Sequence, residues 1–402
     1  MSSIESILAD VTIPDVVTVE QSWPRSKVST GQLEEVLSPR ALGRLVSQGE
    51  SIAIAVGSRG VADQTAVVAR LVSSIRAAGA NPFIVPAMGS HGSATGEGQS
   101  NLLAGMGISE MTVGAPVWSS MEVECVGEAE GLPVMIDRHA WHADGIIIVN
   151  RIKPHPSFRG DRESGLAKMV AIGLGKQAGA QACHARGMME MEASVLAIAS
   201  YVLRTGRIRA GVALLENAYH ETCHIELLPQ DQIIQREPAL LKKARRLQPT
   251  LPFPELDVLI LDQIGKDIAG TGFDCNVLGR YSNPALSGGP AISRIAVLRL
   301  TPETHGNANG IGLVDVTTRR VFDRLTFEET YPNALTSTAS VSVKIPMVMA
   351  TDSLTIRAAI QMTGIADPAE LRLVRIRDTL SLAELQASSA AVAVLGSAEA
   401  KI

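Results

Sequence analysis

The chain has 402 residues, of which 46% are hydrophobic and only 3% aromatic, and its formal net charge is −5. The length favours two or three domains, and the composition is typical of a folded enzyme with an aliphatic core rather than of a fibrous or disordered chain. The net negative charge argues against nucleic acid as the main partner, and the lack of any run of eighteen apolar residues argues against a membrane span.

Two further features indicate the compartment. Residues 1–12 include acidic side chains and no basic segment ahead of an apolar run, so we expect no secretory signal there. The four cysteines are scattered and form no C-x-x-C pair, which suits a reducing environment and excludes a cysteine zinc knuckle. We therefore expect a cytoplasmic protein.

The first half of the chain predicts a βαβ unit. A buried strand over 51–57 leads through a turn containing Arg59 into an amphipathic helix, and a strand over 83–86 precedes a glycine-flanked His91. Strands joined in this way are parallel, so Arg59 and His91 should lie at the same edge of one sheet. In open α/β sheets, ligands bind at that edge.

The next stretch concentrates residues suited to chemistry. An apolar strand over 145–149 ends in a polar loop with His155, and a helix that Ser164 is expected to cap carries Lys168 on an apolar face. His184 follows sixteen residues after Lys168. Alone, such a lysine more often reaches solvent, and a loop histidine is more often solvated. Together, these side chains indicate a site.

The glycine-rich segments do not form a nucleotide-binding motif. The sequence G-L-G-K at 173–176 lacks the upstream glycine and the following Ser or Thr of a phosphate loop. The sequence G-T-G at 270–272 lacks a third glycine, because Cys275 stands at that position. A plain NAD site is therefore not predicted.

The proline-rich segment 248–254 is the clearest linker, and it follows an expected helix over 184–204 and a second helix. We place the domain boundary there, with one domain over 1–250 and another over 251–402. The expected fold class is α/β: two α/β domains with mainly parallel sheets and the active site in the cleft between them.

Five spaced motifs resemble the lactate racemase family of nickel-pincer-nucleotide enzymes. They are G-S-H-G with His91, K-P-H-P-S-F-R-G with His155, E-S-G-L-A-K-M with Lys168, A-C-H with His184 and Q-I-G-K-D with Lys266. The resemblance implies a racemase or epimerase of a small-molecule 2-hydroxy acid. It also implies that the first domain holds the cofactor and that the second contributes Lys266.

The resemblance implies a role for each matching residue. Lys168 matches the lysine joined covalently to the cofactor, a nicotinate-derived mononucleotide whose two sulfur arms hold nickel. His184 matches the histidine that donates a ring nitrogen to the nickel, and such soft donors in a flat arrangement suit Ni(II). His91 and His155 match the general acid and base.

Further positions match substrate contacts. Arg59 and Lys266 are similar to the anchors of the substrate carboxylate, and Gln263 occupies a matching polar position. Asp262 stands where lactate racemases have a tyrosine and receives no role.

The implied chemistry explains the pair of histidines. The hydrogen on the α-carbon is too weakly acidic for a histidine to remove, whereas hydride transfer to the cofactor ring avoids a carbanion while one histidine takes the hydroxyl proton. The flat 2-keto acid can then take hydride back on its other face. Two histidines are needed because the enantiomers present their hydroxyls on opposite sides.

The chain departs from the lactate enzymes in two places. The loop between His155 and Lys168 is longer, and it adds Arg159, Asp161, Arg162 and Glu163. The turn around Arg59 reads G-S-R-G rather than an acidic, proline-rich version. We therefore expect a substrate larger or more polar than lactate, such as a sugar acid or a dicarboxylic hydroxy acid.

Two other functional classes remain open. One is a metal-dependent hydrolase or lyase with a site built from His91, His155 and His184, although none of them has H-x-x-x-H spacing. The other is a nucleotide-binding protein without catalysis. The sequence leaves the oligomeric state open and is compatible with a homo-oligomer.

Overall fold

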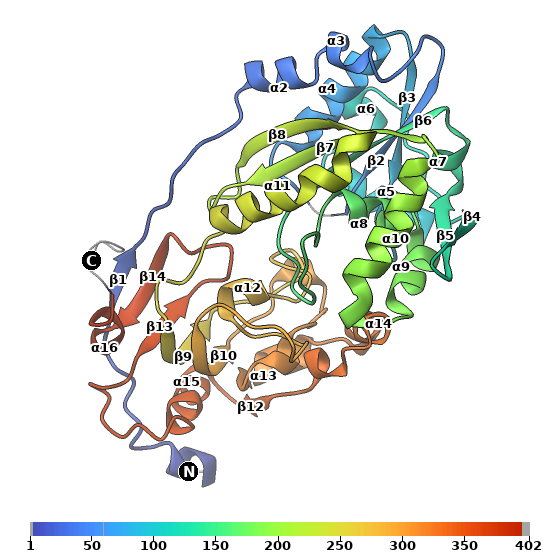
Figure 1. Ribbon diagram of the computed structural model, residues 1–402. Coiled ribbons are helices and arrows are strands. Elements are labelled where there is room, and N and C mark those ends of the chain that lie inside the picture. The colour runs from blue at the N-terminus through green and yellow to red at the C-terminus, as the bar shows by residue number, and fades with distance from the viewer. Residues whose placement is uncertain (1–2, 59, 396–402) are drawn as a thin grey trace. The chain divides into compact units, whose positions relative to one another are not determined.

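The structure is a computed structural model that describes residues 3–58 and 60–395, apart from the side chain at position 336 (Figure 1). The chain divides into two compact units, Pro24–Gln248 and Met1–Trp23 with Pro249–Ile402. The proline-rich segment thus coincides with the boundary near residue 250. The first 23 residues differ from the expected division, because β1 (Val16–Glu20) pairs antiparallel with β14 (Glu384–Ser388) of the C-terminal part.

The unit Pro24–Gln248 is built on one mainly parallel sheet with the strand order β3-β2-β6-β7-β8. Neighbouring strands are parallel from β3 to β7, and β8 is antiparallel to β7. The strands of this sheet are β2 (Ser51–Val56), β3 (Asn81–Pro86), β6 (Gly145–Arg151), β7 (Ile208–Glu216) and β8 (Thr222–Pro229).

Helices cover both faces of this sheet, which explains why its central strands are nearly continuous apolar runs (Figure 1). One face packs against α8, α9, α10 and α11, and the other against α3 and α4. The further elements of this unit are α2 (Thr30–Val36), α3 (Pro39–Leu42), α4 (Gln64–Ala77), α5 (Gly96–Gly105), α6 (Glu110–Val113), β4 (Val123–Ala129), β5 (Leu132–Asp137), α7 (Arg138–His142), α8 (Leu166–Lys168), a π-helix (Met169–Gly173), α9 (Lys176–His184), α10 (Met191–Arg204) and α11 (Ile233–Leu247).

The second unit also has a mixed sheet, with the order β1-β14-β13-β9-β10-β11-β12. The strands from β13 to β12 are parallel, and β14 is antiparallel to both of its neighbours. Its remaining elements are α1 (Ser3–Ile7), β9 (Glu255–Leu261), α12 (Cys275–Leu278), β10 (Ala291–Val297), β11 (Val316–Thr318), α13 (Arg319–Arg324), α14 (Phe327–Ser337), β12 (Met347–Met349), α15 (Asp352–Gln361), β13 (Leu373–Ile376) and α16 (Ser389–Val392).

The predicted α/β class with mainly parallel sheets is confirmed, and two local expectations are wrong. The helix expected over 184–204 is interrupted, because His184 ends α9 and Gly187 has a left-handed φ of 82° before α10 begins. Ser164 does not cap a helix, because its main chain pairs with Lys153 instead. Among the described residues, no helix is long and apolar enough to cross a membrane.

Candidate active site

Three loops with predicted site residues leave the same edge of the sheet in the first unit. Strand β2 lies between β3 and β6 and is parallel to both, so the carboxyl ends of the three strands lie side by side. His91 follows β3, and His155 follows β6. Arg59, which follows β2, lies outside the described residues, but its neighbour Ser58 is described. This is the edge at which open α/β sheets bind ligands.

The His91 ring is bonded to the loop that follows β2. Its Nδ1 forms a short hydrogen bond with the Ser58 hydroxyl, so the ends of two adjacent strands meet at this ring. The glycines around His91 let its loop lie close to the neighbouring main chain, and the Gly89 amide donates to the Gly173 carbonyl at 3.2 Å. The His91 loop therefore lies against the π-helix that follows Lys168.

A buried lysine, Lys176, supports the same loop through residues that contact it. The Lys176 side chain is fully buried, and its Nζ lies 2.5 Å from the Pro86 carbonyl, 2.8 Å from Gln99 Oε1 and 3.1 Å from Asp137 Oδ2. Gln99 in turn donates to the Gly89 carbonyl at 2.9 Å and to the His91 carbonyl at 3.2 Å. Burial lowers the pKa of Lys176, while the Asp137 carboxylate acts in the opposite direction.

Lys176 therefore has a structural role and is not a phosphate-loop lysine. Its backbone has a φ of 54°, in the left-handed region that few residues other than glycine adopt. The ammonium joins the end of β3, the His91 loop and the start of the helix that ends at His184. The Asp137 carboxylate favours the charged form of this lysine and opposes the effect of burial on its pKa.

His155 lies near the start of a loop whose two ends are joined by hydrogen bonds. Lys153 and Ser164 exchange two main-chain hydrogen bonds, at 2.9 and 3.2 Å, and so join the ends of this loop. The His155 ring packs against Phe158 with 4.4 Å between the ring centroids. The side chain of Glu163 is fully buried and accepts a 2.6 Å hydrogen bond from the His155 amide.

Three of the four charged residues of this loop, Arg159, Arg162 and Glu163, form hydrogen bonds within the loop or with neighbouring elements. Arg159 donates to the His155 carbonyl at 2.7 Å, and Arg162 donates to the Ile234 carbonyl at 3.0 Å. Glu163 lies 2.5 Å from Arg245 of α11. Of the added residues, only Asp161 is exposed.

Lys168 stands where the helical winding changes. It ends α8, and the next five residues form a π-helix, a rare winding that occurs often at functional sites. Glu237 of α11 supports the start of α8, because its Oε2 accepts from the Ala167 amide at 3.0 Å. Glu237 is fully buried, and burial raises its pKa to about 7.

His184 and Lys168 share one neighbourhood. The helix α9 packs against the π-helix, and the positive charge of Lys168 acts on both Cys183 and His184. Burial, and after it the Lys168 charge, lower the pKa of the His184 imidazole, which favours a neutral ring with a free lone pair. Burial raises the pKa of the neighbouring Cys183 thiol to about 12, so that side chain is a core residue rather than a thiolate ligand.

The expected substrate residues of the C-terminal half lie after β9 in the second unit. Gln263 donates to Asp378 Oδ2 at 2.9 Å, and the Lys266 amide donates to the Thr304 hydroxyl at 3.0 Å. Asp262 accepts a hydrogen bond from Arg375 at 2.7 Å. These loops also follow the carboxyl end of a parallel strand.

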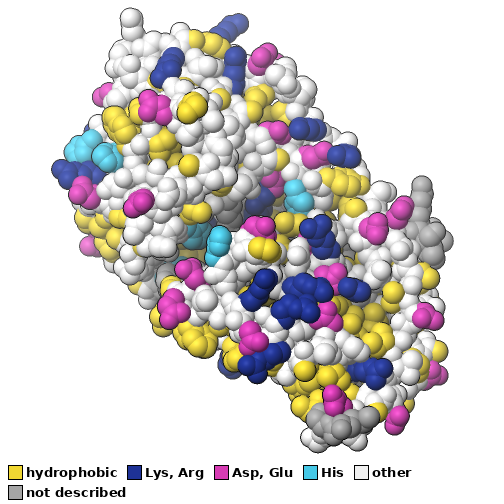
Figure 2. Space-filling view, turned by 180° about the vertical axis from the view of Figure 1, so that it is seen from behind, with side chains coloured by type: hydrophobic (Ala, Val, Ile, Leu, Met, Phe, Trp, Pro, Cys, Tyr) yellow, Lys and Arg dark blue, Asp and Glu magenta, His cyan; other side chains and the backbone are white. Residues whose placement is uncertain are grey.

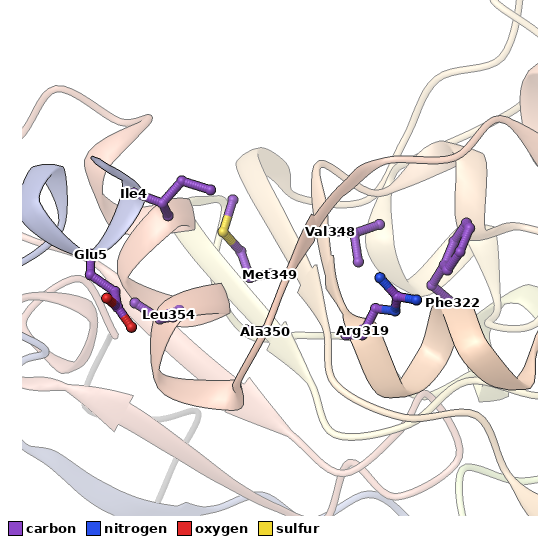
Figure 3. Close-up of a pocket in the computed structure, with 8 residues that line it drawn as sticks. All are labelled: Ile4, Glu5, Arg319, Phe322, Val348, Met349, Ala350 and Leu354. Atoms are coloured by element: carbon purple, nitrogen blue, oxygen red, sulfur yellow. The ribbon is translucent and has the colours of Figure 1, made fainter. Parts of the chain in front are cut away.

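A separate pocket of about 440 Å³ in the second unit holds none of the predicted site residues. In Figure 3, Ile4 and Glu5 lie at one end of this pocket, and Arg319 and Phe322 lie at the other. Its lining is mostly apolar, and its two charged side chains come from opposite ends. It therefore lacks the convergent polar groups that a catalytic pocket needs.

On the face shown in Figure 2, several basic side chains gather together with acidic ones.

The structure adds site residues that the sequence did not reveal. Ser58 bonds the His91 ring, Glu237 supports the start of α8 and Lys176 bonds the end of β3, each through a contact distant in sequence. Glu163, which the sequence identified only as a charged residue of its loop, bonds the main chain of His155. The sequence showed Lys176 only as the last residue of a G-L-G-K segment that does not match a phosphate loop. For Glu163 and Glu237, no local pattern distinguishes a buried glutamate from an exposed one.

The first unit is an α/β fold with helices on both faces of a mainly parallel sheet, a class in which ligands bind beyond the carboxyl ends of the strands. Residues 6–196 match the family described as the lactate racemase N-terminal domain, so the chain carries a domain of this family and the predicted resemblance is confirmed. The family supports an isomerase of the racemase type.

The chain is also similar to a solved structure titled as the lactate racemase apoprotein from Thermoanaerobacterium thermosaccharolyticum. The two share 11% identity with a TM-score of 0.51, over 92% of this chain and 99% of the other. At this identity the similarity shows the fold alone. No curated protein matches the chain.

Proposed function

We propose that this protein is a racemase or epimerase of a 2-hydroxy acid that works with a nickel-pincer nucleotide. The observation that carries the proposal is the common neighbourhood of Lys168 and His184, two residues sixteen positions apart on separate helices. It gives one side chain with a nucleophilic amine and another with a metal-binding nitrogen, as covalent attachment and nickel ligation would require.

The residues present fit this group. Lys168 would hold the nucleotide covalently, and His184, whose pKa is lowered first by burial and then by the Lys168 charge, would donate a ring nitrogen to nickel. Cys183 stays buried and protonated, so His184 is the only soft-metal ligand of this adjacent pair. When bound, the cofactor would supply an electron-poor ring that accepts hydride.

The acid and base would come from the loops at the sheet edge. His91 and His155 follow strands on either side of β2, so they approach this edge from two positions. Each would move a proton to or from the substrate hydroxyl oxygen, one for each enantiomer. Arg59 and Lys266 are the proposed anchors of the substrate carboxylate, and Gln263 is a further proposed substrate-binding residue.

Neither alternative gains support. Among the described residues, no group of three or more His, Cys, Asp or Glu side chains is arranged to hold a metal ion, which disfavours a hydrolase or lyase centre of three histidines. A binding protein without catalysis would not need two histidines on loops at the ligand-binding edge.

The proposal is tested by loading the protein with cofactor and following one enantiomer of a 2-hydroxy acid by chiral chromatography. We expect racemisation by the wild type and none by Lys168→Ala. Loaded wild type that changes no 2-hydroxy acid would overturn the proposal.

A further inference from the structure

The loop that contains His155 is organised around one buried carboxylate. Glu163 Oε2 accepts from the His155 amide at 2.6 Å, and Oε1 accepts from the Gly160 amide at 3.3 Å and from Arg245 at 2.5 Å. Arg245 also donates to the Gly160 carbonyl at 2.9 Å. The carboxylate therefore accepts hydrogen bonds from two main-chain amides of the loop. The Arg245 guanidinium neutralises its negative charge.

The main chain of His155 is held from both sides. Glu163 accepts from its amide, and Arg159 donates to its carbonyl at 2.7 Å. The ring lies against Phe158, which is itself buried. With its backbone and one ring face fixed, the imidazole has little freedom to rotate.

The loop also sets the hydrogen-bonding state of the His155 ring. The Ser157 amide donates to His155 Nδ1 at 3.1 Å. A main-chain N–H is only a donor, so Nδ1 must keep its lone pair, and the proton of the neutral ring must lie on Nε2. A proton on Nδ1 would face the Ser157 N–H and break this bond.

We propose that Glu163 and the Ser157 amide are the groups that position His155, holding its neutral ring as the tautomer with the proton on Nε2. His91 is different, because its Nδ1 is bonded to the Ser58 hydroxyl, which either donates or accepts. The two histidines are therefore not equivalent in the resting protein.

The catalytic consequence rests on the proposed function. His155 meets the substrate as a hydrogen-bond donor through Nε2–H, and His91 acts as the base. The neutral His91 ring has its proton on Nδ1 and donates it to the Ser58 oxygen, so its Nε2 is the nitrogen that takes the substrate hydroxyl proton. For the other enantiomer, His155 acts as the base on Nε2 only as the other tautomer, with its proton on Nδ1 and the Ser157 amide released.

Nitrogen NMR of the cofactor-free protein with ¹⁵N-labelled histidine tests the tautomer directly. His155→Gln identifies the His155 signals by their loss. We expect an unprotonated Nδ1 and a protonated Nε2 in the wild type at a pH where the ring is neutral. A protonated Nδ1, or an averaged signal from both tautomers, would overturn the proposal.

Two variants test the groups that position the ring, and a third serves as their control. Ser157→Pro removes the donating amide and Glu163→Gln removes one carboxylate oxygen, and we expect both to shift the signals toward a mixture of tautomers. Glu192→Gln is the matched control, because Glu192 accepts from the Arg162 amide at 2.9 Å in the same loop without bonding His155, and it should leave the tautomer unchanged.

The variants keep the proposal falsifiable. If Ser157→Pro does not fold, Glu163→Gln still decides the role of the carboxylate, and unchanged wild-type signals in that variant would exclude it. Because no cofactor is needed, the NMR result is separate from the test of activity. Loaded protein without racemase activity but with the expected tautomer would refute the proposed function and leave this assignment standing.

Discussion

Lys168 ends one short helix and His184 ends another, and the positive charge of Lys168 acts on the His184 imidazole. The π-helix starts directly after Lys168, and the helix of His184 packs against it. This pair is the centre of the proposed cofactor site, and it gives the first prediction.

Lys168→Ala is expected to abolish covalent attachment of the cofactor. The wild type, produced together with the enzymes that make the cofactor, should show an adduct in intact-mass spectrometry, because Lys168 provides the amine. Lys242→Ala is the matched control, because Lys242 is exposed on α11 and the variant should keep the adduct. Unmodified wild type with full activity would exclude Lys168 as the attachment point.

The histidines should separate into two classes. His91→Ala or His155→Ala should lower turnover by roughly a hundredfold to ten-thousandfold, the usual contribution of a positioned general acid or base, and should retain nickel. His184→Ala should lose nickel, because it removes the imidazole ligand. Elemental analysis beside the racemisation rate checks this. Loss of nickel from the first two variants, and not from the third, would mean that the roles are reversed.

The buried Lys176–Asp137 pair should dominate the stability of the His91 loop. Lys176→Met leaves an uncompensated carboxylate in the core, which should reduce the free energy of unfolding by about 3–5 kcal/mol. Adding Asp137→Asn should recover part of this loss, because it removes the charge and keeps an oxygen for the Ala140 amide. Denaturant unfolding measures both, and an unchanged midpoint for Lys176→Met would contradict the account.

Much of the fold was predictable from local pattern. The strands predicted at 51–57, 83–86 and 145–149 correspond to the parallel strands β2, β3 and β6, whose apolar residues are buried on both faces of the sheet. The polar loops that follow these strands carry candidate site residues, and they were recognisable because each directly follows an apolar run. These features depend only on residues close together in the sequence.

The supporting contacts were not predictable, because they join distant positions. Glu163 and Arg245 are 82 residues apart, and Lys176 and Gln99 are 77 apart. The π-helix also has no local signature, so a regular helix was expected around Lys168. The sequence therefore identified the candidate functional side chains and missed the groups that hold them.

Glu237 should make stability depend on pH in an unusual direction. Burial raises its pKa from 4.5 to about 7, so the folded protein retains a proton that the unfolded chain releases between these values. Stability from this group is therefore present below about pH 4.5 and is lost as the pH rises through about 7.

Glu237→Gln removes this dependence, because the amide is neutral at every pH. The free energy of unfolding of the variant, minus that of the wild type, should be larger at pH 8 than at pH 5, by up to about 3 kcal/mol. Urea unfolding at the two pH values measures the difference. If the gap between variant and wild type is the same at both, Glu237 is not the titrating group.

The central claim is most directly tested by a panel of single-enantiomer 2-hydroxy acids incubated with cofactor-loaded protein and analysed by chiral chromatography. Because the loop after His155 is expected to be longer than in the lactate enzymes, we expect a sugar acid or a dicarboxylic hydroxy acid to be racemised or epimerised faster than lactate. A panel led by lactate would contradict the expected substrate. A panel in which loaded protein with the Lys168 adduct inverts no member at all would contradict the assignment of the protein as a racemase.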